Sequence, residues 1–304
     1  MNGRLLIRSI LFSAWVIGCL SCERDFNIAL KKGPEQLVVE AYINNELPLY
    51  NYVILTHGQE YFDTSFTNIP VAGAIVTITE GIMLGDGSYQ WDASTRKHLT
   101  EAESPQIPGG RIPGLYMDTT VFNNPAQALN GRVGKHYLLE IETKGNRYTA
   151  TTFLPPPVEL DSVTSGHHFM DSIYEKARLT IYFKDPDTIG NTQLYYWRIN
   201  YHHGNSFGWG AFGNNRYLPG TDDLVNGEYL QLTPNNGFPV GDTVHFHLVS
   251  VERKVYNFWD SYNKARDNSG PFATPVKLAS TVEGSNVVGC FSGFSLSTKS
   301  ILVK

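Results

Sequence analysis

Residues 135–153 (KHYLLEIETKGNRYTATTF) decide the fold class of this chain. Apolar and polar residues alternate at a period of two in the first half, as they do along a half-buried β-strand. One face of this strand would carry Tyr137, Leu139 and Ile141, and the other Glu140 and Glu142. Residues 144–147 (KGNR) give a turn signal, and the alternation resumes over 148–153. The stretch therefore predicts a β-hairpin.

Similar short runs of aromatic and β-branched residues recur on both sides of this hairpin. The chain contains 17 tyrosines and 16 phenylalanines, and its 28 glycines and 16 prolines punctuate the runs. Residues 101–114 hold three prolines and three glycines, so we expect a loop there. The pattern predicts an all-β fold of the β-sandwich type. Its other strands are expected at residues 36–43, 51–56, 71–79, 158–163, 177–184, 193–201, 242–251 and 294–303.

Three consecutive prolines, residues 155–157, mark the expected boundary between two β-sandwich-like domains. Proline has no N–H group to donate to a strand ladder, and a run of prolines favours an extended spacer. The predicted organisation is a signal peptide at 1–22, a tether at 23–35, an N-terminal immunoglobulin-like β domain at 36–154, a proline linker at 155–157 and a C-terminal β domain at 158–304.

One amphipathic helix interrupts the predicted C-terminal β domain, at residues 252–266. Its apolar residues fall at helical spacing and form one stripe. The stripe consists of Val255, Phe258, Trp259 and Tyr262. A stripe of this kind usually covers the open face or the end of a sheet.

The N-terminal segment is typical of a bacterial lipoprotein signal peptide. Arg4 and Arg8 precede an uncharged run at 9–20 that is too short to cross a bilayer as a helix. Cys22 follows this run and is the predicted site of lipid attachment, with Cys19 as the alternative. An ordinary cleaved signal peptide and an uncleaved anchor helix remain as other interpretations. In a chain that starts at a lipidated Cys22, Cys290 is the only other cysteine, so no internal disulfide is expected.

Other composition and motifs argue against several functional classes. A net charge of −5 without basic clusters makes nucleic acid an unfavourable partner. The letters of residues 208–213 match GxGxxG, but no helix can follow them to receive a phosphate. The sequence has no nucleophile elbow, zinc-protease helix or P-loop. We therefore predict no catalytic residue, no metal and no cofactor.

Histidines and acidic clusters in the sequence have structural explanations that we favour over metal binding. His245 and His247 would share one face of a strand, a spacing that can ligate a metal, although hydrogen-bonded surface histidines are commoner. His167 and His168 are expected in a polar loop. The acidic clusters at 184–188 and 220–223 lack an EF-hand pattern, so we interpret their aspartates as turn caps.

The most unusual stretch is 204–217 (GNSFGWGAFGNNRY), in which aromatic residues alternate with glycine and asparagine. Its aromatic residues, Phe207, Trp209, Phe212 and Tyr217, are the candidate binding residues. Rigid aromatic side chains on a pliable backbone are typical of binding loops. The alternative is a crossover whose aromatic side chains fold onto the sandwich, and both interpretations stay open.

Several segments together resemble a known family. The segments are residues 37–43 soon after the lipidated cysteine, 241–243, 270–275 (GPFATP) and 285–289 (SNVVG). They resemble the lipoprotein family of domain of unknown function 4249, over nearly all of the mature chain. The resemblance implies an anchored β-rich protein of Bacteroidetes-type bacteria, often encoded near TonB-dependent receptors. No activity follows from the resemblance. It also implies a turn around Cys290.

Two local resemblances add to this. Residues 70–78 are similar to carboxypeptidase-regulatory-like and other immunoglobulin-like modules. Glu23 and Asp25 look like the acidic signal that directs such lipoproteins to the cell surface.

The expected function is that of a lipid-anchored outer-membrane protein that acts as an accessory or ligand-binding partner of a TonB-dependent type receptor. The membrane lipid would be contacted through the acyl anchor. A surface hydrolase acting on glycan or peptide is the alternative, and a structural module of the cell envelope is a third. A pair of carboxylates clustered in a cleft would favour the hydrolase.

Overall fold

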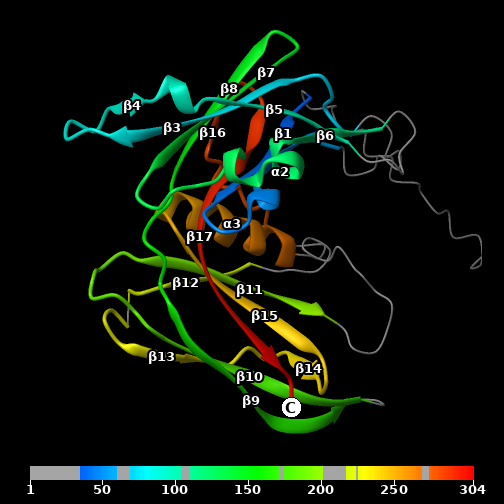
Figure 1. The fold of residues 1–304 in the computed structure, drawn as a ribbon, viewed down its shortest axis with the longest axis vertical. Coiled ribbons are helices and arrows are strands. Elements are labelled where there is room, and N and C mark those ends of the chain that lie inside the picture. The colour runs from blue at the N-terminus through cyan, green and yellow to red at the C-terminus, as the bar shows by residue number, and fades with distance from the viewer. Residues whose placement is uncertain are drawn as a thin grey trace, which may run out of the picture. The chain divides into compact units, whose positions relative to one another are not determined.

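The structure is a computed structural model that describes residues 35–59, 69–103, 110–171, 174–200, 217–223, 225–268 and 274–304. Most of these residues form β-strands (Figure 1). The strands are β1 (Leu37–Asn44), β2 (Tyr52–His57), β3 (Ile75–Met83), β4 (Tyr89–Trp91), β5 (Lys97–Glu103), β6 (Arg111–Met117), β7 (His136–Thr143), β8 (Asn146–Phe153), β9 (Leu160–Asp171), β10 (Tyr174–Lys184), β11 (Thr192–Asn200), β12 (Leu218–Thr221), β13 (Tyr229–Leu232), β14 (Gly237–Pro239), β15 (Thr243–Val251), β16 (Val282–Glu283) and β17 (Val287–Leu302). The helices are α2 (Thr120–Asn123) and α3 (Arg253–Asp267), with 3-10 turns at Pro48–Tyr50, Ala93–Thr95 and Pro125–Gln127. The predicted all-β fold with one amphipathic helix is confirmed.

Two sheets account for these strands. The larger has 13 strands in the order β12-β11-β15-β17-β1-β2-β6-β5-β3-β7-β8-β16, with β4 paired to β3. The smaller has four strands, in which β10 pairs with β9, β13 and β14. The pairing of β1 with β17 is parallel, whereas the other pairs are antiparallel. The two ends of the described chain therefore meet in the middle of one sheet.

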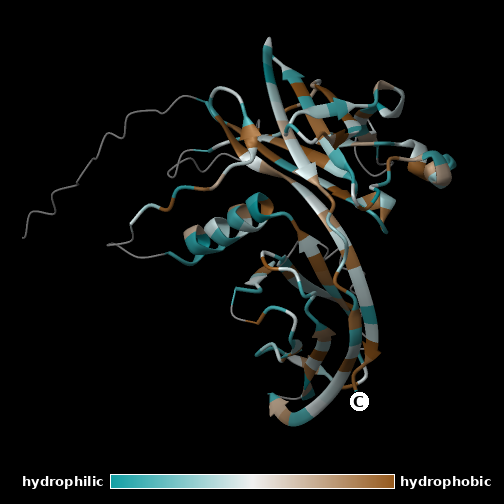
Figure 2. Ribbon diagram, turned by 90° about the vertical axis from the view of Figure 1, so that its left-hand side faces the viewer, coloured by the Kyte–Doolittle hydropathy of each residue, from teal (hydrophilic) through white to brown (hydrophobic). Residues whose placement is uncertain are grey.

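The long strand β17 connects both halves of the larger sheet. Its first half pairs with β1, from Val287 to Phe294, and its second half pairs with β15, from Ser295 to Leu302. Figure 1 shows β17 as one long strand that runs to the C-terminus, which Figure 2 also marks. A strand this long lets one segment contribute to separate hydrophobic clusters.

Buried side chains gather in three clusters. The first lies between β1–β2 and β3–β7–β8, with Ile43, Leu139 and Phe291 at its centre. The second lies beneath α3, and the third lies between β9–β10 and β11–β15. The first and third clusters lie between packed strands, and the second includes the buried side of α3.

The predicted hairpin is confirmed as β7 and β8. Thr143 pairs with Asn146, so Lys144 and Gly145 alone form the turn. Both have positive φ, 49° and 76°, which matches the twist of a two-residue hairpin. The apolar face is buried as predicted, and Arg147 donates a hydrogen bond to Glu140 on the other face.

Helix α3 confirms the predicted helix, with one difference in its buried stripe. Val255, Phe258 and Trp259 are buried, but Tyr262 is 40% exposed. Asn263 is buried instead, because its side chain donates a hydrogen bond to the carbonyl of Tyr217 at 2.6 Å.

The structure corrects three local predictions. Within the predicted loop at 101–114, residues 101–103 belong to β5 and residues 111–114 belong to β6, while 104–109 lie outside the described residues. Pro113 fits in β6 because it lies between Arg111 and Tyr116, opposite the register shift, and not at a paired position. His167 and His168 lie on β9, where a bulge accommodates the positive φ of His167. Cys290 lies inside β17 rather than in a turn, because this part of β17 pairs with β1 and Cys290 is opposite Glu40 in the ladder.

No strand runs through the three prolines, since β8 ends at Phe153 and β9 begins at Leu160. The N–H groups of Val158 and Leu160 donate to the hydroxyls of Ser250 and Ser297, which fixes this connection to β15 and β17. The expected domain boundary at 155–157 stays a prediction. No helix within the described ranges is long and apolar enough to cross a membrane.

Candidate functional site

A cavity of about 660 Å³ lies beside β5 and β6. We call it the β5–β6 cavity. Its volume falls within the range of about 300–1,000 Å³ that is usual for small-molecule sites. It is lined by Gly73, Ala74, Leu99, Thr100, Glu101, Glu103, Arg111, Tyr116, Thr119, Phe122 and Asn123. Polar, charged and aromatic groups from four segments of the chain therefore converge on one hollow.

Strands β5 and β6 position the charged groups of the cavity. Glu101 pairs with Tyr116 and Glu103 pairs with Arg111 across the antiparallel ladder. Glu101 and Glu103, which flank the register shift in this ladder, both line the cavity. Arg111 lies opposite Glu103, so the site carries both signs of charge.

Glu101 is held in place by donors around its carboxylate. Its Oε1 accepts from the N–H of Gly73 at 3.3 Å and from that of Gly114 at 3.4 Å. It also lies 3.4 Å from the hydroxyl of Tyr116, whose single proton is donated to the carbonyl of Val71. These contacts are long, so the carboxylate remains available to a ligand that offers closer donors.

Tyr116 forms the buried floor of the cavity. Its hydroxyl donates to the carbonyl of Val71 at 2.8 Å and accepts from the N–H of Ala74 at 2.9 Å. Burial, and to a smaller extent the charge of Glu101, raise the pKa of Tyr116 above its ordinary value. The phenol is therefore neutral at physiological pH and acts as a fixed support rather than as a base.

Helix α2 presents Phe122 at the rim. The helix begins after Asp118, whose carboxylate accepts the N–H groups of Thr120 at 3.0 Å and Leu129 at 2.8 Å. Burial alone would raise the pKa of Asp118, but these hydrogen bonds outweigh it and lower the pKa. The ring of Phe122 is 61% exposed, which is unusual for a phenylalanine and leaves an aromatic face free to contact a ligand.

The arrangement can bind a small polar ligand. Carboxylates accept hydrogen bonds from hydroxyl or amine groups, Arg111 offers donors to an anionic group, and Phe122 offers a flat apolar surface. Such a mixture of one aromatic surface and a few polar groups fixes the orientation of a ligand.

The residues predicted from the sequence lie elsewhere. Cys22, Phe207, Trp209 and Phe212 fall outside the described residues, so their roles stay predictions. Tyr217 is half-buried, and its ring packs against Trp259 and Phe294 at centroid distances of 4.5 and 5.4 Å. Leu218 and Pro219, which follow it, line a second cavity of about 680 Å³ together with Asn263, Lys264, Asp267, Asn268, Thr274 and Val276.

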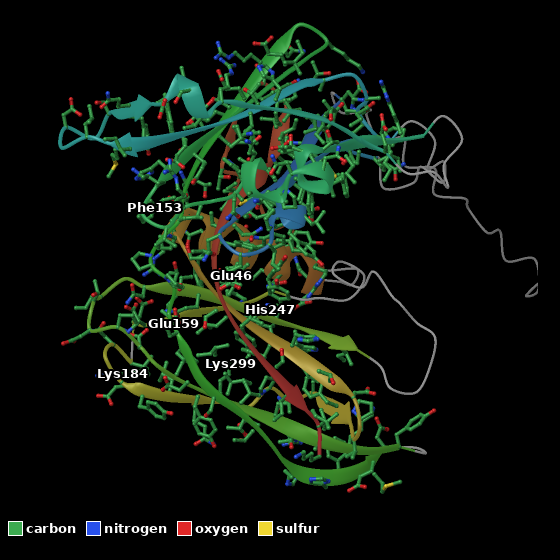
Figure 3. All side chains as sticks on the ribbon, viewed as in Figure 1. Glu46, Phe153, Glu159, Lys184, His247 and Lys299 are labelled. Carbon is green, nitrogen blue, oxygen red and sulfur yellow. The ribbon has the colours of Figure 1, made fainter. Side chains whose placement is uncertain are left out.

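The histidines considered as metal ligands bond to hydroxyl groups. Nδ1 of His245 lies 2.7 Å from Ser300 Oγ, and Nδ1 of His247, labelled in Figure 3, lies 2.8 Å from Thr298 Oγ1. Among the residues that the structure describes, no three histidine, cysteine or acidic side chains form a metal-binding group.

Sequence reasoning missed the β5–β6 cavity because it placed Glu101, Glu103 and Arg111 in a loop. The strand had little signal in the sequence, because its apolar residues Leu99 and Ala102 are three positions apart and the register shift beside Glu101 interrupts the period of two. Phe122 had no signal, because a single phenylalanine in a polar stretch does not reveal its exposure.

Comparisons with known proteins give one family. Residues 23–300 match the family model described as Domain of unknown function (DUF4249). A search of curated proteins gave no match. The matched region covers all the described strands except the last residues of β17, and it includes the whole β5–β6 cavity. The chain belongs to the domain of unknown function 4249 family.

Proposed function

We propose that this protein is an outer-membrane-anchored lipoprotein that captures a ligand in the β5–β6 cavity and acts as an accessory partner of a membrane receptor of the TonB-dependent type. The observation that carries the proposal is the convergence of Glu101, Arg111 and the exposed ring of Phe122 on one cavity.

The anchor is supported by the N-terminal sequence. The family match begins at residue 23, directly after Cys22, so the signal-like segment 1–22 lies outside the matched region. A lipid on Cys22 would leave residues 23–34 between the membrane and the described residues, which begin at Glu35. A chain of this length can hold a domain at a membrane surface without fixing its orientation.

Lipid attachment gives the first expected result. In a bacterium that processes lipoproteins, metabolic labelling with a fatty-acid analogue should label the parent chain and the Cys19→Ala variant, but not Cys22→Ala. The reason is that acylation needs a thiol at the residue that follows the apolar run. The reverse pattern would move the anchor to Cys19, and an unlabelled parent chain would contradict the lipoprotein proposal.

A surface hydrolase is the second candidate, because Glu101 and Glu103 both line the cavity. Two carboxylates in one cleft are the machinery of most glycoside hydrolases. Cleavage of a glycan or peptide by the parent chain that is lost in both Glu101→Gln and Glu103→Gln would replace the binding proposal.

Isolation of the anchored protein with its partner from native membranes tests the proposal. The cavity variant Phe122→Ala removes the exposed ring without removing a core side chain, and Met170→Ala removes a similarly exposed apolar side chain on β9, outside the cavity. A purely structural role in the cell envelope would leave both variants with the same partners as the parent chain.

A further inference from the structure

Two acidic turns meet where β10 ends and β11 begins. Asp185 directly follows Lys184, the last residue of β10 (Figure 3), and Asp222 directly follows β12. Hydrogen bonds join the turns: the N–H groups of Gly190 and Asn191 donate to Oδ2 of Asp222 at 2.8 and 2.9 Å. The sequence analysis interpreted these aspartates as turn caps, and the structure shows that Asp222 accepts N–H groups of the other cluster's turn, so the two clusters are neighbours.

The carboxylates of Asp185 and Asp222 are both buried, with 1% of each residue exposed. Within the described part of the chain, neither forms an ion pair with a lysine, arginine or histidine. A buried charge without a counter-charge is costly, and proteins normally pair such a group or coordinate it to a metal.

Two buried oxygen atoms at these turns also have no hydrogen-bond donor. They are Oδ1 of Asp222 and Oδ1 of Asn226. Nearly all buried polar atoms in proteins have a partner, so an unpaired carboxylate oxygen on a residue that is 1% exposed calls for one. The other oxygen of Asp222 already accepts two N–H groups, which leaves Oδ1 as the free ligand atom.

Asp185 and Asp222 are like charges in adjoining turns, which hydrogen bonds hold together. The N–H of Gly227 donates to Oδ2 of Asp185 at 3.2 Å, which brings the turn that carries Asn226 beside the same carboxylate. Hydrogen bonds thus join the segments that carry Asp185, Asp222 and Asn226, and two of these side chains have a buried oxygen without a donor.

We propose that these two turns bind a calcium ion through Oδ1 of Asp222, Oδ1 of Asn226 and the carboxylate of Asp185. Calcium prefers carboxylate and amide oxygens on loops, and it completes its six to eight ligands with carbonyl groups and water. Zinc and copper favour histidine and cysteine, neither of which lies at these turns. The ion would connect β10, in the four-stranded sheet, with β11 and β12, in the larger sheet.

Calcium binding by the full chain tests the proposal. The detergent-solubilised protein is stripped with EDTA and then titrated with calcium chloride, while bound calcium is measured by equilibrium dialysis and unfolding by a thermal melt. We expect one calcium ion per chain and a rise of the melting temperature of roughly 2–4 °C at millimolar calcium. An unchanged melt with no bound calcium would overturn the proposal.

The decisive variant is Asp222→Asn, which keeps an oxygen for the N–H groups of Gly190 and Asn191 but removes the charge. It should lose the calcium-dependent rise, while in EDTA it melts no lower than the parent chain, because the repulsion with Asp185 is gone. Asp223→Asn is the matched control: Asp223 is exposed and bonds to the hydroxyl of Thr221, so this variant should respond to calcium as the parent does.

Asp185→Asn is the second variant if Asp222→Asn does not fold, and it should also lose the response. Calcium binding that persists unchanged in the folded variant of either residue would contradict the assigned ligands. A melting response to magnesium that equals the response to calcium would overturn the assignment of calcium.

Discussion

The variant Gly289→Ala should unfold with a free energy of unfolding about 3–5 kcal/mol below that of the parent chain. Gly289 lies in β17 opposite Val39 of β1, at the parallel pairing in the middle of the larger sheet. A Cβ atom at this position would lie 1.9 Å from the carbonyl oxygen of Val39, and the φ of Gly289 is +155°. Alanine would therefore force the two strands apart. Denaturant unfolding, followed by tryptophan fluorescence, measures the loss.

Gly85→Ala is the matched control for this clash. Nothing lies within 4 Å of a Cβ atom built at Gly85, in the turn between β3 and β4. Its free energy of unfolding should stay within about 0.5 kcal/mol of the parent value. Equal stability of Gly289→Ala and Gly85→Ala would mean that β1 and β17 do not pair in this register.

Trp259→Ala should lower the free energy of unfolding by about 3–5 kcal/mol. The residue is 8% exposed, its Nε1–H donates to the hydroxyl of Ser292 at 3.2 Å, and its ring packs 4.5 Å from that of Tyr217. Removal of the indole would leave a cavity between α3 and β17 and would remove one of the hydrogen bonds of the Ser292 hydroxyl. Urea denaturation measured by far-ultraviolet circular dichroism reports the change, because the remaining signal does not depend on Trp259.

Tyr262→Ala tests whether the buried side of α3 carries this stability. Tyr262 lies on the same helix, three residues later, but 40% of it is exposed. We expect its removal to cost less than about 1.5 kcal/mol. If Tyr262→Ala lost as much stability as Trp259→Ala, the helix would pack through a different face from the one described.

The alternation of apolar and polar residues predicted those strands that have one buried face and one solvent-exposed face. The hairpin of β7 and β8 is the clearest case, because burial of Tyr137, Leu139 and Ile141 follows a period of two. The long-range pairing of β1 with β17 left no local signal, since 250 positions separate Val39 from Gly289 in the register. Such pairing depends on side-chain packing between distant segments, which a local pattern does not contain.

The candidate site was less predictable than the strands. Prolines and glycines suggested a loop at residues 101–114, but a register shift lets Pro113 lie in β6 without a ladder hydrogen bond. The two acidic clusters were visible in the sequence, whereas their meeting depends on how β10, β11 and β12 end beside one another. A site that forms only when distant segments come together cannot be recognised from the local sequence around each residue.

The most direct test of the proposed function is isolation of the anchored protein from its native membrane, with identification of the proteins that accompany it. For the parent chain and for Met170→Ala, we expect one integral outer-membrane receptor in stoichiometric amount. Phe122→Ala should recover at least tenfold less of that receptor, because loss of an aromatic contact worth about 1.4 kcal/mol or more weakens binding by that factor. Its melting temperature should be unchanged. Recovery of no membrane protein with the parent chain, or equal recovery with Phe122→Ala, would contradict a receptor partnership that acts through the β5–β6 cavity.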